Sequence, residues 1–272
     1  MSATPQLPPL ARIEQKTVVD MLAKGKRIGE RGSNDYRGMN IEVGLIEKAN
    51  GSAQIHLGKT KVLVGVKVET GTPFPDTPDQ GVLTVNAELV PMASPLFEPG
   101  PPGEEAIELA RVVDRGIRES KTIDLAKLCI QPGKKVLVVF VDIYVLDHDG
   151  NLIDAASIAS LAALLNAKMR EFKIKNDELE FTDKLIPLPL HNYPVAVTAA
   201  KIENNIVLDP SIEEEQVMSA RLTITVEKDN RICAIQKGGL GNITPDEVKR
   251  SVRIAIDKAA QNRERILEAA GR

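Results

Sequence analysis

Aromatic side chains are scarce in this 272-residue chain, at 3% of residues, and tryptophan is absent. Proteins that hold single-stranded nucleic acids by stacking bases use more aromatic faces than this, so stacking is excluded as the main mode of binding. The chain also lacks a strong charge of either sign, because its formal net charge is only −3. No global positive field attracts nucleic acid from a distance, and any contact with a nucleic acid must come from a local patch.

Metal-binding and redox patterns are missing as well. The two cysteines, Cys129 and Cys233, are far apart and form no CxxC pair, so we expect reduced thiols in the core of a cytosolic protein. His56, His148 and His191 have no HExxH or other ligand spacing, and the sequence has no nucleophile elbow. These absences predict no metal and no cofactor.

The first ten residues contain neither the basic segment nor the apolar segment of a signal peptide. No apolar stretch in the sequence approaches the length of a membrane span. We therefore expect a cytoplasmic protein that makes no contact with a membrane.

Hydrophobic periodicity divides the first two thirds of the chain into short strands and three helices. Residues 1–32 are predicted to form an N-terminal helix and loop, with the helix at Arg12–Ala23. Strands are predicted at 40–46, 53–57, 61–69, 82–90 and 135–146, the last of them buried on both faces. Further helices are predicted at 104–119 and 154–172.

The last third repeats this pattern. Two hairpins are predicted, one over 194–208 and one over 221–236. The closing helix begins with a capping box, in which Thr244 is the N-cap residue, Pro245 follows it and Glu247 completes the box. Groups of strands followed by a helix, twice over, predict an α/β (α+β) fold of two related halves, 33–185 and 190–272.

Three segments resemble ligand-binding motifs but depart from them. Gly51–Thr60 has six residues between its glycines where a phosphate loop needs four, and it alternates like a hairpin. Gly238–Gly241 follows an antiparallel hairpin, which favours a loop over a dinucleotide site. Asp147–Asp149 starts like a calcium loop, but Leu152 stands where an EF-hand needs glycine. A small-molecule-binding α/β protein that uses the first two loops stays an alternative.

One feature carries chemistry. Arg111, Arg115 and Arg118 have the spacing i, i+4, i+7 on a predicted helix, so their guanidinium groups share one face. Such a row suits a chain of phosphates, because each arginine can hold a phosphate with paired hydrogen bonds. From the spacing alone, a solvated face with local ion pairs to Glu108, Asp114 and Glu119 is favoured instead.

The segment 98–115 adds a resemblance to a known family. It contains Glu98-Pro99-Gly100-Pro101-Pro102 and continues through Ile107-Glu108-Leu109-Ala110-Arg111 to Asp114-Arg115. This segment closely resembles the non-catalytic RNase PH-like subunits of the archaeal exosome. The resemblance covers almost the whole chain and includes Asp35-Tyr36-Arg37, Asn50-Gly51-Ser52-Ala53, Asp76-Thr77-Pro78, Val145-Leu146-Asp147 and Ile235-Gln236-Lys237.

The resemblance implies a fold, an assembly and a substrate. It implies the RNase PH-type fold of two related ββαβα-like halves. In this family, catalytic subunits use phosphate to shorten single-stranded RNA from its 3′ end. Non-catalytic subunits alternate with them in a hexameric ring of three heterodimers, and RNA-binding cap subunits sit on one face of the ring. We therefore expect a catalytic RNase PH-like partner and cap subunits.

The resemblance also implies that this chain has no catalytic residues of its own. Catalytic relatives carry a phosphate-binding Gly-Thr/Ser-Arg element where this chain has Leu152-Ile153-Asp154. Ile153 cannot hold a phosphate there, and we expect Asp154 to repel it. The same relatives carry an Arg-Arg pair where this chain has Glu104-Glu105. Their catalytic aspartate aligns with Arg221, and a guanidinium group cannot act as a general acid. We expect an inactive subunit; an autonomous phosphorolytic exoribonuclease is the alternative.

The arginine row has a role in the resemblance. Arg111 and Arg115 match arginines of the non-catalytic subunits that face the neighbouring active site and hold the RNA backbone, which gives binding independent of sequence. Arg118 is assigned to the same row, with pairing to a carboxylate as the alternative. Relatives often have an Arg-x-Asp-Gly-Arg motif near the N-terminus, and Arg27–Gly32 departs from it.

Overall fold

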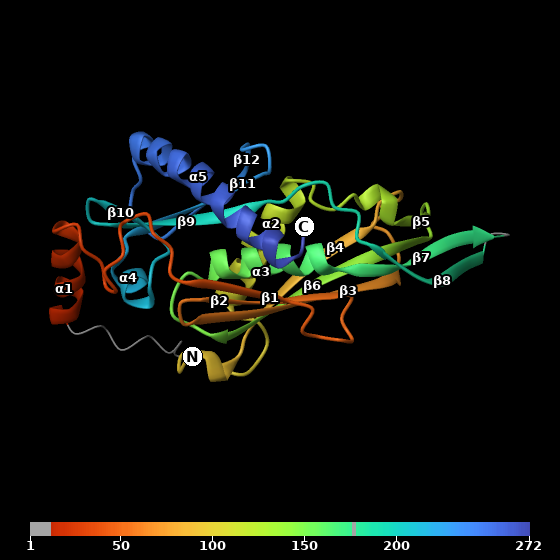
Figure 1. Cartoon of the computed structure of the whole chain (residues 1–272), viewed down its shortest axis with the longest axis horizontal. Helices are drawn as coiled ribbons and strands as arrows, with labels where there is room; N and C mark the ends of the chain where they lie inside the picture. The colour runs from red at the N-terminus through yellow and green to blue at the C-terminus, as the bar shows by residue number, and fades with distance from the viewer. Residues whose placement is uncertain (1–11, 176–177) are drawn as a thin grey trace.

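Two β-sheets enclose one buried helix, α3 (Leu152–Asn166), in the computed structural model, which describes residues 12–175 and 178–272 (Figure 1). The first sheet has the strand order β1-β2-β3-β6-β4, with β5 paired to β6, and only β4 and β6 run parallel. Its strands are β1 (Met39–Val43), β2 (Gly51–Leu57), β3 (Thr60–Gly71), β4 (Val82–Leu89), β5 (Cys129–Gln131) and β6 (Lys135–Asp147).

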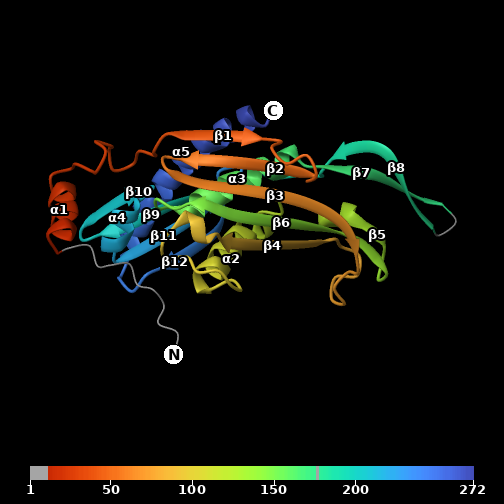
Figure 2. The same cartoon turned by 90° about the horizontal axis from the view of Figure 1, so that it is seen from below.

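The second sheet is smaller and wholly antiparallel, with the order β10-β9-β11-β12. Its strands are β9 (Val195–Ile202), β10 (Asn205–Leu208), β11 (Ala220–Val226) and β12 (Ile232–Gly238). A separate ribbon of β7 (Lys168–Lys175) and β8 (Glu178–Pro187) projects from one end of the molecule (Figure 2). The other helices are α1 (Arg12–Ala23), α2 (Glu104–Glu119), α4 (Ile212–Val217) and α5 (Pro245–Ala269).

Helix α3 is buried on all sides because it packs against β2 and β3 of the first sheet and against β9 of the second. Its sequence is almost entirely alanine, leucine and isoleucine, and the small alanines let both sheets approach closely. The buried side chains of both sheets therefore form one hydrophobic core around this helix.

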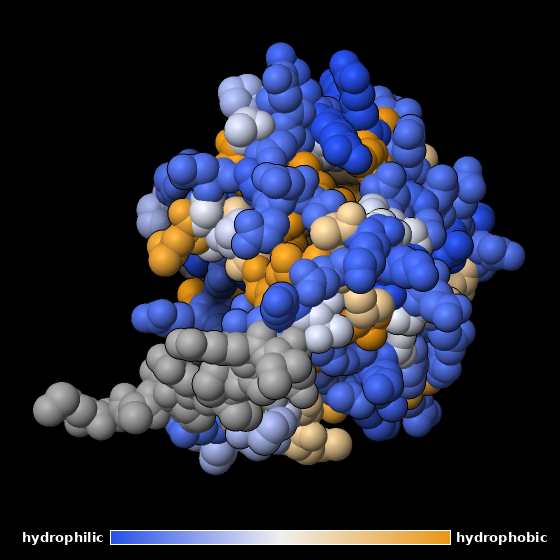
Figure 3. Space-filling model, turned by 90° about the vertical axis from the view of Figure 1, so that its left-hand side faces the viewer, coloured by the Kyte–Doolittle hydropathy of each residue, from blue (hydrophilic) through white to orange (hydrophobic). Residues whose placement is uncertain are grey.

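A second, smaller core lies at the end of the molecule opposite the ribbon. There Val18 and Leu22 of α1 pack with Ala200, Ile202 and Val207 of the second sheet. Seen from this end, hydrophilic residues cover most of the surface and hydrophobic residues gather in a hollow near its centre (Figure 3). Within the described part of the chain, no helix is long and apolar enough to cross a membrane.

Most of the predicted elements are confirmed. The helices at 12–23 and 104–119 have the predicted bounds, both predicted hairpins of the last third form, and the Thr244–Glu247 capping box opens α5. The predicted α/β (α+β) class is also confirmed. The hairpin interpretation of 51–60 is confirmed, since β2 and β3 pair across the turn at Gly58.

Two expectations were wrong, and one short helix was missed. The helix predicted at 154–172 ends at Asn166, because Lys168 turns into β7 and bonds to both the backbone and the side chain of Asn50. Strand β6 is fully buried on one face only, and Tyr144 on its other face is exposed. Helix α4 was not predicted, although Ser211 and Glu214 form a capping box there. The division into 33–185 and 190–272 stays a prediction, and residue 185 lies within β8.

The central position of α3 generates a stability prediction. Leu161 lies on α3 with 2% of its surface exposed, so Leu161→Ala should lower the free energy of unfolding by roughly 2–5 kcal/mol, through lost burial and a residual cavity. Leu185→Ala is the matched control, because this leucine on β8 is 58% exposed and its truncation should cost less than about 0.5 kcal/mol. Urea unfolding measures both, and equal effects of the two substitutions would contradict this account of the core.

Candidate functional site

The predicted arginine row lies along an open groove beside α2. Helix α2 buries one face and leaves the other exposed, and Arg111, Arg115 and Arg118 all lie on the exposed face. The groove has a volume of about 830 Å³ and is bordered by α2, by β4 and by the edge strand β12, which Figure 2 shows on the same side of the molecule. Its charged lining residues are Glu104, Glu108, Arg111, Asp114, Arg115, Arg118 and Glu119.

The three arginines are in different states. Arg118 is held by Asp114, with hydrogen bonds of 3.1 and 2.7 Å, and also donates to the Leu83 carbonyl. The hydrogen bond to Asp114 raises the pKa of Arg118 above the ordinary value of an arginine. Arg115 donates to the neutral Gln236 side chain at 3.2 Å. The side chain of Arg111 has no ion pair or hydrogen bond to any residue within 12–175 and 178–272.

The local ion pairs considered from the sequence form only in part. Asp114 pairs with Arg118, but Glu108 pairs with Arg221 of β11, at 2.6 Å. Arg111 and Arg115 thus face the groove without a carboxylate partner, whereas Arg118 is already neutralised. Two of the three guanidinium groups are available to an anion, and the binding role of all three stays a prediction.

A buried network of arginines and carboxylates lies at the start of α3. Arg27, which is 2% exposed, donates to both carboxylate oxygens of Glu214, at 2.8 and 2.6 Å, and to the Asp209 carbonyl. Arg31 and Arg37 pair with the Asp209 carboxylate at 2.9 and 2.8 Å. Sequence reasoning did not find this network, although the Arg27–Gly32 segment that departs from the family motif supplies two of its arginines.

The carboxylate of Glu215 lies at the N-terminus of α3. It accepts a hydrogen bond of 2.8 Å from the backbone N–H of Asn151, the residue that precedes the helix. A helix N-terminus with free N–H groups is a general anion-binding position. Burial raises the pKa of Glu215 to about 7, although the Asn151 N–H and the charges of Arg221 and Arg37 oppose the shift. This anion position is therefore filled by the chain itself.

Asp154 corrects one detail of the sequence interpretation. It was expected to face a phosphate pocket and repel the anion, but it is fully buried inside the first turn of α3. Its carboxylate accepts hydrogen bonds from Tyr36, Asn151 and Thr198. Burial raises its pKa to about 6 against these hydrogen bonds. Asp154 joins the two halves of the fold and does not line a pocket.

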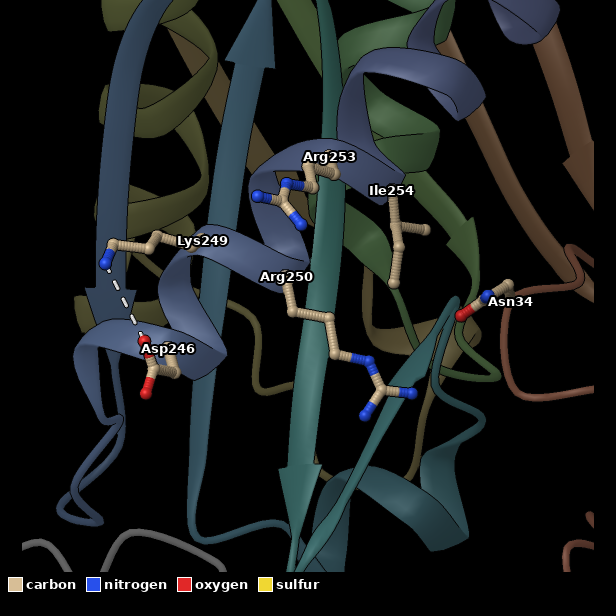
Figure 4. A pocket seen from close by; sticks show the side chains of 6 residues that line it. All are labelled: Asn34, Asp246, Lys249, Arg250, Arg253 and Ile254. Carbon is tan, nitrogen blue, oxygen red and sulfur yellow. Dashed lines mark ion pairs between the residues drawn. The ribbon is translucent and has the colours of Figure 1, made fainter.

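A second groove, of about 390 Å³, lies between the first turns of α5 and Asn34. Figure 4 shows that its cationic side chains do not converge: Lys249 pairs with Asp246 at 3.7 Å, while Arg250 and Arg253 extend in different directions. Because a polyanion site needs convergent donors, the groove beside α2 is the better candidate.

The two cysteines and two of the histidines have separate surroundings in the described part of the chain. Cys129 and Cys233 are free thiols that are half-buried rather than core residues, and burial raises the pKa of Cys233 to about 11. His148 stacks on Phe97, and burial lowers its pKa. His191 pairs with Asp124. In the part of the chain that the structure describes, no three His, Cys, Asp or Glu residues are grouped to hold a metal ion.

The fold and the sequence together define the class. Residues 35–170 match domain 1 of the 3′ exoribonuclease family and residues 192–258 match domain 2. The chain therefore belongs to the RNase PH family of 3′ exoribonucleases. The expected RNase PH-type fold is confirmed by the same two matches and by the structural comparison below.

Within this family, the chain is most usefully compared with individual exosome proteins. The exosome complex component Rrp42 of Pyrococcus horikoshii is 55% identical over 262 residues, which is 96% of each chain. The protein of the same name from Thermococcus kodakarensis is 52% identical over 265 residues, which is 97% of each chain. Among solved structures, a chain of the Archaeoglobus fulgidus exosome with RNA bound to the active site is 46% identical with a TM-score of 0.86, covering 93% of this chain and 98% of that one.

The position of Glu215 generates a pH prediction. Because its pKa rises from 4.5 to about 7 on folding, the folded state binds this proton more tightly than the unfolded state. Its contribution to stability is therefore lost as the pH rises from about 4.5 to 7. Glu215→Gln keeps a carbonyl oxygen that can accept from Asn151 but cannot ionise, so its stability relative to the wild type should increase by roughly 1–3 kcal/mol across this window.

Urea unfolding of both proteins at pH 5, 6, 7 and 8 measures this difference. Glu264→Gln, on an exposed part of α5, is the control and should give a curve parallel to that of the wild type. A constant difference between the Glu215→Gln variant and the wild type over the whole range would show that Glu215 ionises as an ordinary surface carboxylate.

Proposed function

We propose that this chain is a non-catalytic subunit of an archaeal-type exosome ring in the cytoplasm. It pairs with a catalytic RNase PH-type subunit, three such heterodimers form the ring, and RNA-binding cap subunits sit on it. In this assembly the chain structures the active site of its partner, and its α2 arginines hold the RNA backbone during phosphate-dependent degradation from the 3′ end.

Two available guanidinium groups on one groove carry this proposal. Arg111 and Arg115 lie one helical turn apart and exposed, without a carboxylate partner. Each guanidinium can hold a phosphate through paired hydrogen bonds, and such contacts read no base sequence. Relatives named as exosome components, together with a similar chain from an exosome with RNA at its active site, support RNA as the polyanion.

The local chemistry supports the absence of independent catalysis. The anion position at the start of α3 is filled by Glu215, so inorganic phosphate would have to displace a carboxylate of the chain. Arg221 stands where the resemblance places a catalytic aspartate, and its guanidinium is bound to Glu108. Glu104 and Glu105 are exposed in the first turn of α2. Their negative charges interact favourably with the helix dipole there and would repel a phosphate.

The two alternatives have less support. An autonomous phosphorolytic nuclease needs a cationic phosphate site, and the start of α3 offers a carboxylate instead. A small-molecule site on the Gly51 or Gly238 loops has less support, because a Cβ atom at Gly51 would lie 2.5 Å from the Ala163 carbonyl oxygen and one at Gly238 would lie 2.8 Å from Arg221 Nε. Neither glycine therefore opens toward a ligand.

The first prediction from this proposal concerns activity. The purified chain alone should not shorten single-stranded RNA in the presence of phosphate, because it has no site for the attacking phosphate. The complex co-expressed with its catalytic RNase PH-type partner should do so and release nucleoside diphosphates. Gel analysis of a labelled RNA checks both, and phosphate-dependent shortening by the chain alone would favour the autonomous nuclease.

The second prediction concerns the arginine row. Arg111→Glu and Arg115→Glu should leave assembly intact and weaken RNA binding by the complex roughly tenfold each, because each substitution replaces a charged hydrogen-bond donor by a carboxylate. The slope of log affinity against log salt should become shallower by about one phosphate contact. Fluorescence anisotropy without phosphate measures binding in the absence of turnover.

Arg253→Glu is the matched control, because this exposed arginine lies on α5 in the other groove. It should bind RNA as the wild type does. Arg118→Glu should have a smaller effect on RNA binding than Arg111→Glu, since Arg118 is already paired with Asp114. Unchanged RNA affinity of both the Arg111→Glu and Arg115→Glu complexes at low salt would remove the RNA role.

A further inference from the structure

Arg221 reaches α2 by crossing the edge strand of the second sheet. It lies on β11 directly opposite Gly238 of β12. A Cβ atom at Gly238 would lie 2.8 Å from Arg221 Nε and 3.1 Å from its Cγ, so the arginine side chain passes over the space that glycine leaves open. Beyond β12 the guanidinium meets the carboxylate of Glu108 at 2.6 Å. The path of the Arg221 side chain explains why glycine stands at position 238, at the start of the 238–241 loop.

The ion pair between Arg221 and Glu108 contributes little to the stability of the fold. The side chain of Arg221 is 23% exposed and that of Glu108 is 41% exposed. Ion pairs in contact with water contribute little to the free energy of folding, because solvent screens the attraction and two long side chains must be ordered. The pair therefore calls for an explanation other than structural support.

The charges around the groove supply that explanation. Four carboxylates and three guanidinium groups line the groove, so it is not positive as a whole. Asp114 is neutralised by Arg118. Glu108 is three residues before Arg111 on the same helix, which is a spacing at which opposite charges meet. A released Glu108 could pair with Arg111, which alone among the three groove arginines has no side-chain partner within the described residues.

We propose that Arg221 is a positioning residue that holds Glu108 away from Arg111 and so keeps Arg111 available for an RNA phosphate. Gly238 is part of the same device, because it lets the Arg221 side chain cross β12. The inference rests on the proposed function and adds to it a residue pair that does not touch the RNA. Pairing of Asp114 with Arg118 and of Glu108 with Arg221 thus leaves Arg111 to meet a phosphate.

Removal and rescue test this inference in the complex with the catalytic partner. Arg221→Gln releases Glu108 and should weaken binding of single-stranded RNA roughly three- to tenfold at 0.1 M salt, as measured by anisotropy without phosphate. The double variant Glu108→Gln with Arg221→Gln should return to within about twofold of the wild type, because the competing carboxylate is gone. Gly238→Ala should weaken binding in the same direction, and Glu108→Gln should rescue it as well.

Arg231→Gln is the control on the same hairpin. Arg231 pairs with Glu227 at the exposed end of β12, away from the groove, and its loss should leave RNA affinity unchanged. The Arg111→Glu complex is run beside these variants, so that the two proposals fail separately. Loss of affinity in Arg111→Glu with none in Arg221→Gln would overturn the positioning role alone.

A loss in Arg221→Gln that Glu108→Gln does not rescue would also overturn it, since Arg221 would then act directly or through the fold. Unchanged RNA affinity in Arg111→Glu, in contrast, would overturn the proposed function itself.

Discussion

Asp209 lies fully buried between segments that are far apart in the sequence, and its carboxylate accepts hydrogen bonds from Arg31, Arg37 and Asn151. Burial by itself would raise the pKa of Asp209, but the hydrogen bond and charge of Arg37 lower it overall. An unpaired charge at this depth would be costly, so each partner has to stay in place. The Asp209 carboxylate thereby fixes the positions of the N-terminal segment, the start of α3 and the second sheet relative to one another.

The rest of the candidate site depends on that geometry. With the start of α3 fixed, the backbone N–H of Asn151 points at Glu215, and the anion position of the helix is occupied from within. The second sheet is held against α3 by Asp154, which bonds to Thr198 of β9. Strands β11 and β12 then lie beside α2, and Arg221 can reach Glu108. The buried charge network thus determines which exposed charged side chains meet beside the groove.

Much of the fold could be predicted because its signals are local. The Thr244–Glu247 capping box and the hairpin over 221–236 depend on residues close in sequence, and both form as expected. The ribbon of β7 and β8 was missed, because the helical pattern predicted through Lys168–Phe172 is overruled by strand pairing with residues that follow later in the chain, from Phe181 to Pro187. The short α4 carried a capping-box signal that could have found it.

The sequence by itself determined the class of fold, the helix that carries the arginine row and the face of that helix on which Arg111, Arg115 and Arg118 lie, because a helical repeat decides which side chains share a face. Only the tertiary structure decided which of these arginines are available. Arg118 is neutralised within its own helix, whereas the Arg111 side chain has no partner in the part of the chain that the structure describes. Its neighbour Glu108 is held by an arginine more than a hundred residues away. Long-range pairing of charges depends on how the chain packs, and a local pattern does not contain it.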